Sequence, residues 1–250
     1  MKIAILISGL TRDYEKTYSN LKEQLLDKYE CDIFISTWDI IGCYNLHRNK
    51  NYTNNVNWCN IKNKLNISNF IEKYNPKKIN IENYDNWEIK ITPEINNFLN
   101  YYNFTSFTKN LNSLFAQWYK IKDVFTIFEN YCNENNKNYD IIIKLRFDVF
   151  FKLPDLNTIN NDNIYFLNKW RENTPQDYIF FSKNLINIKK LFLLYNFIIN
   201  RNNNLNHSKF NIQKQGNTGA TSELILYHFI IDNNIKHKIL NFNTSLSTGI

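Results

Sequence analysis

The hydrophobic pattern of the chain alternates between short apolar runs and longer stretches with a helical period. An apolar run over Lys2–Ser8 is followed by large apolar residues at helical spacing from Tyr14 to about Tyr29, and then by a second apolar run over Cys31–Ser36. Short apolar runs that end in polar residues predict strands buried on both faces. A strand, a helix and a strand in this order predict the start of a parallel sheet with crossover helices.

The middle of the chain carries the strongest helical stripe, from Leu111 to Tyr131. It leads directly into the β-branched run Ile141–Ile143, so we expect this long helix to pack on the sheet. Further strands are predicted over Lys78–Ile81, Ile164–Leu167, Tyr178–Phe181 and Lys238–Phe242, and further helices over Ser68–Tyr74, Leu185–Ile199 and Leu224–Ile231.

Together these elements predict one α/β domain over residues 1–250, with a mostly parallel central sheet flanked by helices. Residues 40–66 have no clear period and are assigned to a loop or insertion, Asn168–Asp177 is assigned to a loop, and Asn83–Asn103 receives no assignment.

The stretch Tyr139–Phe151, YDIIIKLRFDVFF, concentrates charge at the end of a buried strand. Lys144, Arg146 and Asp148 follow the isoleucines, and buried charges are costly unless they are paired or bound to something. Open α/β sheets bind ligands at the carboxyl ends of their strands. Asp148 could therefore hold a divalent metal through hard oxygen ligands, or it could be paired with Lys144 or Arg146.

A second candidate site follows the first strand, in the loop Ser8–Arg12. Gly9 would let the backbone approach a ligand, and Arg12 could bind a diphosphate in bidentate fashion. The alternative is a tight turn with a surface arginine. The further glycines of a dinucleotide or P-loop fingerprint are missing.

Three more carboxylates have both a functional and a structural interpretation. Asp39 could contact a nucleotide or sugar hydroxyls, or it could cap a helix or turn. Glu223 could deprotonate an acceptor hydroxyl, although a carboxylate in the first turn of a helix also stabilises the helix dipole. Asp177 could act as the base or bind a sugar, or it could be structural. His237 is a remote candidate for a metal ligand.

Composition and charge limit the compartment and the partners. The formal charge of +7 is compatible with nucleic acid, an anionic membrane or a phosphorylated ligand. The cysteines show no metal-ligand spacing, and the N-terminal apolar run is too short for a signal peptide core. We therefore expect reduced thiols and a cytoplasmic protein, with peripheral contact to an anionic membrane left open.

Taken together, the motifs resemble small glycosyltransferases of the GT-A kind, found in bacterial polysaccharide loci and in some large viruses. The resemblance lies in KIAILISGLTRDYEKTYSNLKEQLLDKYECDIFISTWD, SLFAQWYKIKDV, YDIIIKLRFDVFF, DYIFFSKNL and SELILYHFIIDNNIK, and it spans nearly the whole chain. It implies a GT-A-like (Rossmann-like) fold and an enzyme that transfers a sugar from a nucleotide-sugar donor to a hydroxyl of a glycan or glycoconjugate.

The resemblance also implies roles for single residues. Donor binding would fall to Ser8, Gly9, Arg12, Asp39, Gln117 and Tyr119, the sugar and acceptor would face Asp177 and Glu223, and Asp148 would be the metal ligand. For the base, Glu223 is preferred and Asp177 is second.

One departure from the family pattern concerns the metal. Arg146 stands where the D-x-D motif has its first aspartate, so Arg146 could itself neutralise the leaving diphosphate. Mg²⁺ or Mn²⁺ is expected as a cofactor, and the arginine at the first position of the motif weakens this expectation.

Two other classes of function stay open. A nucleotide-sugar binder without activity would bind the donor but transfer nothing. A basic nucleic-acid-binding protein would need lysines and aromatic residues interleaved on one exposed face. Here the aromatic residues fall mostly on apolar stripes, which favours the core, so no nucleic acid is expected as a partner.

Overall fold

The structure is a computed structural model that describes residues 1–42, 63–102, 111–171, 173–199, 222–242 and 244–246. Most of the loop expected over 40–66 lies outside the described residues. Within the described part, Ile40 forms an isolated bridge with Lys64.

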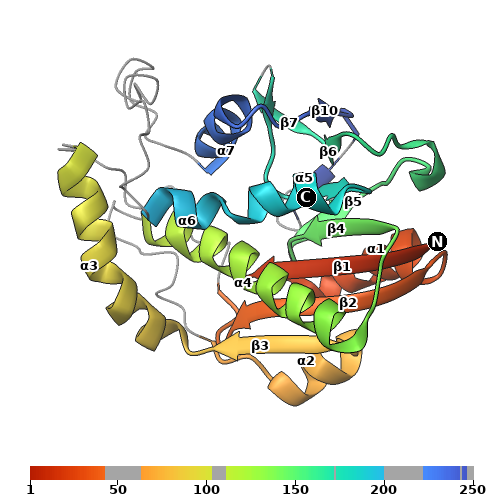
Figure 1. Ribbon diagram of the computed structural model, residues 1–250. Coiled ribbons are helices and arrows are strands. Elements are labelled where there is room, and N and C mark those ends of the chain that lie inside the picture. Colours follow the sequence, from red (N-terminus) through yellow and green to blue (C-terminus); the bar gives the residue numbers. More distant parts are fainter. Residues whose placement is uncertain (43–62, 103–110, 172, 200–221, 243, 247–250) are drawn as a thin grey trace.

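A seven-stranded sheet forms the centre of the described chain (Figure 1). Its order is β10-β6-β9-β4-β1-β2-β3. The strands are β1 (Lys2–Gly9), β2 (Glu30–Trp38), β3 (Lys78–Glu82), β4 (Ile141–Leu145), β6 (Ile164–Phe166), β9 (Phe180–Ser182) and β10 (His237–Ile239). All neighbours pair in parallel except β9, which is antiparallel to both β4 and β6. The predicted mostly parallel α/β sheet is confirmed.

The order of the strands reverses beside β1. The chain proceeds from β1 to β2 and β3 on one side, and β4 then returns to the other side of β1. In open α/β sheets the crevice outside the carboxyl ends of the strands at such a reversal is where ligands bind. We therefore expect a ligand-binding site at the carboxyl ends of β1 and β4.

Both faces of the central strands are buried, as the apolar runs predict. Ile3, Ile5 and Ile7 of β1 belong to one buried cluster, and Ala4 and Leu6 belong to a second cluster on the opposite face. This alternation follows from the period of two in a strand.

Helices cover the two faces of the sheet. The α-helices of the described residues are α1 (Tyr14–Leu21), continued by a π-helical turn (Lys22–Leu26), α2 (Ile67–Tyr74), α3 (Tyr84–Tyr102), α4 (Leu111–Asn135), α5 (Leu185–Phe192), α6 (Leu194–Ile199) and α7 (Ser222–Asp232). In Figure 1, α4, α5 and α6 lie in front of the sheet and α1 lies behind it. The predicted packing of the long helix on the sheet is confirmed, because α4 contacts β1, β2 and β3.

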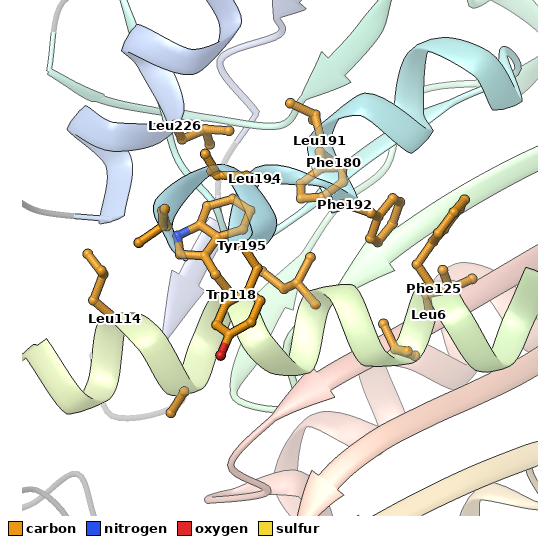
Figure 2. Close-up of a cluster of buried hydrophobic side chains, with 14 of the residues drawn as sticks. Leu6, Leu114, Trp118, Phe125, Phe180, Leu191, Phe192, Leu194, Tyr195 and Leu226 are labelled. Carbon is orange, nitrogen blue, oxygen red and sulfur yellow. The ribbon is translucent and has the colours of Figure 1, made fainter. Parts of the chain in front are cut away.

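The core on the α4 side connects the sheet to the later helices. Figure 2 shows Trp118 of α4 among Leu194 and Tyr195 of α6 and Leu226 of α7. Trp118 and Leu226 are fully buried. The position of α7 is thereby tied to that of α4.

Several segments differ from the sequence-based expectation. The helix expected over Leu185–Ile199 is divided at Leu193, whose N–H donates to the carbonyls of both Lys189 and Lys190. The loop expected over Asn168–Asp177 contains a hairpin of β7 (Lys169–Arg171) and β8 (Thr174–Pro175).

Two further differences concern segments that pattern alone left open. The helix α3 occupies the segment without assignment, where Pro93 lies inside the helix and interrupts its pattern. Val149–Phe151 forms β5, which pairs with β11 (Thr244–Leu246) outside the central sheet. Among the described helices, we find none with the length and apolar character needed to cross a bilayer.

Candidate functional site

The turn after β1 has a special backbone conformation. Gly9 has φ = +110°, a region that side chains disfavour, and its carbonyl accepts a hydrogen bond from Thr37 Oγ1 at 2.7 Å. Arg12 has φ = +42°, and its N–H donates to the carbonyl of Ile41 at 2.7 Å. These contacts with the segment around β2 fix the path of the loop that carries Arg12.

Arg12 and Arg146 meet on the carboxylate of Asp148. Arg146 binds it in bidentate fashion, with Nε 3.0 Å from Oδ1 and Nη2 2.8 Å from Oδ2, and Arg12 Nη1 lies 2.5 Å from Oδ2. The Asp148 side chain is 1% exposed, against 17% for Arg12 and 14% for Arg146. The guanidinium of Arg146 also lies over the ring of Tyr178, 4.6 Å from its centroid. Two arginines from distant segments are thus held together at the reversal of strand order.

The charge state of Asp148 follows from these contacts. Burial alone raises the pKa of its carboxyl, but the charges of Arg146 and Arg12 and their hydrogen bonds outweigh burial and hold the pKa well below the usual range. Asp148 is therefore ionised, and the group of three side chains carries a net charge of about +1.

The surroundings of Asp148 do not fit the expected metal ligand. Both carboxylate oxygens accept hydrogen bonds from guanidinium groups, so a cation there would replace or adjoin two positive charges. Within the described ranges no group of three or more His, Cys, Asp or Glu side chains is arranged to hold a metal. Binding of the expected Mg²⁺ or Mn²⁺ stays a prediction.

A buried lysine lies next to this group. Lys144 of β4 is fully buried, and its Nζ donates to the carbonyl of Asp177 at 2.6 Å. Burial lowers the pKa of Lys144 to about 7, with the charge of Asp177 opposing the shift and that of Arg146 adding to it. In the sequence, Lys144 is a candidate only as a partner of Asp148. A lysine near the end of a strand is ordinarily solvated, so the sequence gives no sign that Lys144 is buried.

Asp177 is the centre of a second polar group. Its side chain is buried, and Oδ2 accepts a hydrogen bond from the amide of Gln117. Its Oδ1 has no hydrogen-bond partner within the described part of the chain. Gln117 lies on α4, so this helix supplies one side chain of the Asp177 group, and the donor-binding role expected for Gln117 stays a prediction.

The same amide connects Asp177 to the start of α7. Gln117 Nε2 also lies 3.2 Å from Ser222 Oγ, which accepts a further hydrogen bond from Trp118 Nε1 at 2.9 Å. Ser222 is the first residue of α7, and Glu223 follows it, half-buried, in the first turn. Two neighbouring residues of α4 therefore fix the end of α7 that carries Glu223.

Asp39 and Tyr119 belong to a third group, beyond the ends of β2 and β3. Asp39 accepts hydrogen bonds from Lys64 Nζ at 2.6 Å, Asn83 Nδ2 at 2.8 Å and the N–H of Tyr84 at 3.0 Å. Its contact with Tyr84 N–H, at the first residue of α3, corresponds to the capping role considered above.

The contacts of Tyr119 complete this third group. Tyr119 Oη donates to Glu82 at 2.9 Å, and Glu82 also pairs with Lys120, which is buried with its Nζ 4.1 Å from the centroid of Trp38. The donor-binding roles of Asp39 and Tyr119 stay predictions.

Replacing Asp39 with alanine is expected to cost about 1 kcal/mol of unfolding free energy, because the first turn of α3 loses a capping acceptor. Lys64→Met removes only the partner in an ion pair whose lysine is 69% exposed, and should change stability by less than about 0.5 kcal/mol. Urea denaturation of both variants measures the difference. Equal effects of the two substitutions would argue against capping by Asp39.

Two hydroxyl groups at the end of β1 are buried without hydrogen-bond partners among the described residues. They are Ser8 Oγ and Thr11 Oγ1, and both residues are almost fully buried. Buried polar groups are normally satisfied, so an orphan pair beside Gly9 and Arg12 is compatible with a ligand or water. Thr11 was not among the residues singled out from sequence, where only the spacing of Ser8, Gly9 and Arg12 was informative.

Comparison with known proteins finds solved structures that resemble this chain only weakly in fold and in sequence. Neither a protein-family model nor a curated protein matches the sequence. Among solved structures, the chain is similar to a glycosyltransferase involved in the glycosylation of the major capsid of PBCV-1, at 8% identity and a TM-score of 0.37, over 96% of this chain and 81% of that chain.

Two further similarities are comparable in extent. One is to the apo-form glycosyltransferase GlyE of Streptococcus pneumoniae, at 8% identity and a TM-score of 0.37, over 95% of this chain but only 45% of that one. The other is to a nucleoside-diphosphate-sugar pyrophosphorylase from Vibrio cholerae, at 8% identity and a TM-score of 0.34, over 95% of this chain and 90% of that one. Likeness at this level carries no argument about function.

Proposed function

We propose that the protein is a glycosyltransferase that moves a sugar from a nucleotide-sugar donor to a hydroxyl of a glycan or glycoconjugate. The observation that carries the proposal is the pair of arginines, Arg12 and Arg146, held at the carboxyl ends of β1 and β4 where the strand order reverses. This is the position at which open α/β sheets bind nucleotides.

The arginines match the chemistry of the leaving group. When the bond between the anomeric carbon and the diphosphate oxygen breaks, its electron pair stays on the oxygen and negative charge develops there. Fixed guanidinium groups in a partly buried site offset that charge without reorganising during the reaction. Because Asp148 fixes both side chains, part of the cost of ordering them is met in the free protein.

The acceptor side of the reaction falls to Glu223 in this proposal. The acceptor oxygen attacks the anomeric carbon, a new carbon–oxygen bond forms, and the hydroxyl proton passes to the carboxylate. Glu223 is half-buried and lies on a helix end fixed by Gln117 and Trp118, whereas Asp177 is almost fully buried and accepts a hydrogen bond from Gln117. Glu223 is therefore the preferred base and Asp177 a residue that holds the site together.

A thermal-shift screen tests the proposal. UDP, GDP, CMP and dTDP sugars are each added with and without Mn²⁺, and we expect one nucleotide class to raise the melting temperature. Arg146→Ala should weaken binding of that donor by about 10- to 100-fold, because hydrogen bonds to charged groups contribute about 1.5–3 kcal/mol.

A matched control removes a different cation. Lys152 is exposed and directly follows β5, so Lys152→Ala changes the net charge equally and should leave donor affinity within about twofold. If no nucleotide-sugar shifts the melting temperature, the proposal fails. If a donor binds but neither hydrolysis nor transfer is observed, the protein is a nucleotide-sugar binder without activity.

A further inference from the structure

We infer that Asp148 is a positioning residue that aligns Arg12 and Arg146 for a diphosphate, and that donor binding needs no divalent cation at Asp148. The inference rests on the proposed function and deepens it, because it says how the charge of the donor is met. It also reverses the role that the sequence motif gives to Asp148.

The first argument is that both oxygens of the Asp148 carboxylate already accept hydrogen bonds from arginines. Oδ1 accepts from Arg146 Nε, and Oδ2 accepts from Arg146 Nη2 and Arg12 Nη1, all between 2.5 and 3.0 Å. The Asp148 side chain is 1% exposed. A metal ligand needs an oxygen lone pair directed at the cation, and hard cations take most of their other ligands from oxygen atoms or water.

The second argument is electrostatic. A divalent cation bound to Asp148 would lie beside two guanidinium groups. At about 4 Å and an effective dielectric constant of about 20, two unit charges interact by about 4 kcal/mol, and a double charge doubles that repulsion. Binding a cation would thus require the arginines to move away from the residue that fixes them.

The third argument is that the arrangement suits an anion. Asp148, Arg12 and Arg146 together carry a net positive charge, and a planar guanidinium matches the geometry of phosphate oxygens. Arg146 is further restrained by the ring of Tyr178. The Asp148 carboxylate therefore orders the two arginines and still leaves a net charge of about +1 for an anion.

The experiment measures binding of UDP, GDP and dTDP by isothermal titration calorimetry, in EDTA and again with Mn²⁺. For the wild type we expect the nucleoside diphosphate that binds to have the same dissociation constant, within about twofold, under both conditions. Asp148→Asn should raise that constant about tenfold in EDTA, since the amide is neutral and its NH₂ group, which cannot accept, would face a guanidinium, and Mn²⁺ should not change the size of the effect.

Asp140→Asn is the matched control. Asp140 lies just before the other end of β4 and accepts a hydrogen bond from the N–H of Lys2, so its substitution should leave nucleotide affinity unchanged. Unchanged affinity in Asp148→Asn would overturn the positioning role of Asp148. The comparison of EDTA with Mn²⁺ on the wild type needs no variant, so it decides whether binding needs a cation even if Asp148→Asn fails to fold.

The outcomes separate the two proposals. Binding that requires Mn²⁺ overturns the inference and leaves the proposed function standing. Absence of binding by every nucleoside diphosphate and nucleotide-sugar, under both conditions, overturns the proposed function and the inference with it.

Discussion

Glu223→Gln is expected to lower the rate of sugar transfer by about 10²- to 10⁴-fold, while KM for the donor stays within about threefold. The substitution keeps the size of the side chain but removes the group that takes the proton of the acceptor hydroxyl, and general bases typically contribute this much to a rate. Donor affinity should hold because the two arginines follow β1 and β4 and are fixed by Asp148, so their arrangement does not depend on Glu223. Steady-state kinetics with the donor identified by thermal shift measure both quantities.

Two comparisons make this result specific. Asp232→Asn removes a carboxylate from the other end of the same helix, where the side chain is exposed, and should leave the rate unchanged. Asp177→Asn disturbs the hydrogen bond from Gln117, so a smaller loss of rate is expected there. A larger loss for Asp177→Asn than for Glu223→Gln would transfer the role of base to Asp177.

Lys144→Met is expected to remove a large dependence of stability on pH. The pKa of the buried ammonium is about 7 in the folded protein, against about 10.4 for an unfolded lysine. Between these values the unfolded chain binds one proton more than the folded chain, so the free energy of unfolding rises with pH. The slope approaches about 1.4 kcal/mol per pH unit, or about 4 kcal/mol between pH 7 and pH 10.

Urea denaturation of the wild type and the variant across that range isolates the contribution of Lys144. The variant lacks the titrating group, so the difference in unfolding free energy between the two proteins should change with pH. Asp177, Arg146 and Asp148 are the charged groups that influence Lys144, and all three are present in both proteins. Lys190→Met removes an exposed lysine and should leave the pH dependence as it is; parallel curves for Lys144→Met and the wild type would contradict the assignment.

The parallel core of the fold could be predicted because its signal is local. The apolar runs at Lys2–Ser8 and Cys31–Ser36 are long enough to be strands, and both became strands with two buried faces. The stripe of α4 was equally clear. By contrast, the direction of β9 depends on its partners β4 and β6, which come from other parts of the sequence, and no local period reports it. The hairpin β7–β8 pairs over a few residues only, but its two strands are too short to show a period.

In the candidate site, too, the local sequence pattern predicts some residues, whereas others depend on contacts between distant segments. Arg12, Arg146 and Asp148 were found from their positions after apolar strands. The role of Lys144 was not, because its burial depends on the pairing of β4 with β9, where Lys144 faces Phe180, and on the carbonyl of Asp177. The contacts of Gln117 with Asp177 and Ser222 likewise join three segments that only the tertiary fold brings together.

The reversal of strand order has a kinetic consequence for the nascent or refolding chain. β1 pairs with β2 across a short crossover, but the contact between Arg12 and Asp148 closes a separation of 136 residues. Contacts between distant segments bear the greater loop-closure entropy and slow folding. During refolding, we expect binding of a nucleoside diphosphate to appear only after β4 has paired with β1. Before that step, β1 and β2 supply only Arg12, and Arg146 is not yet in place.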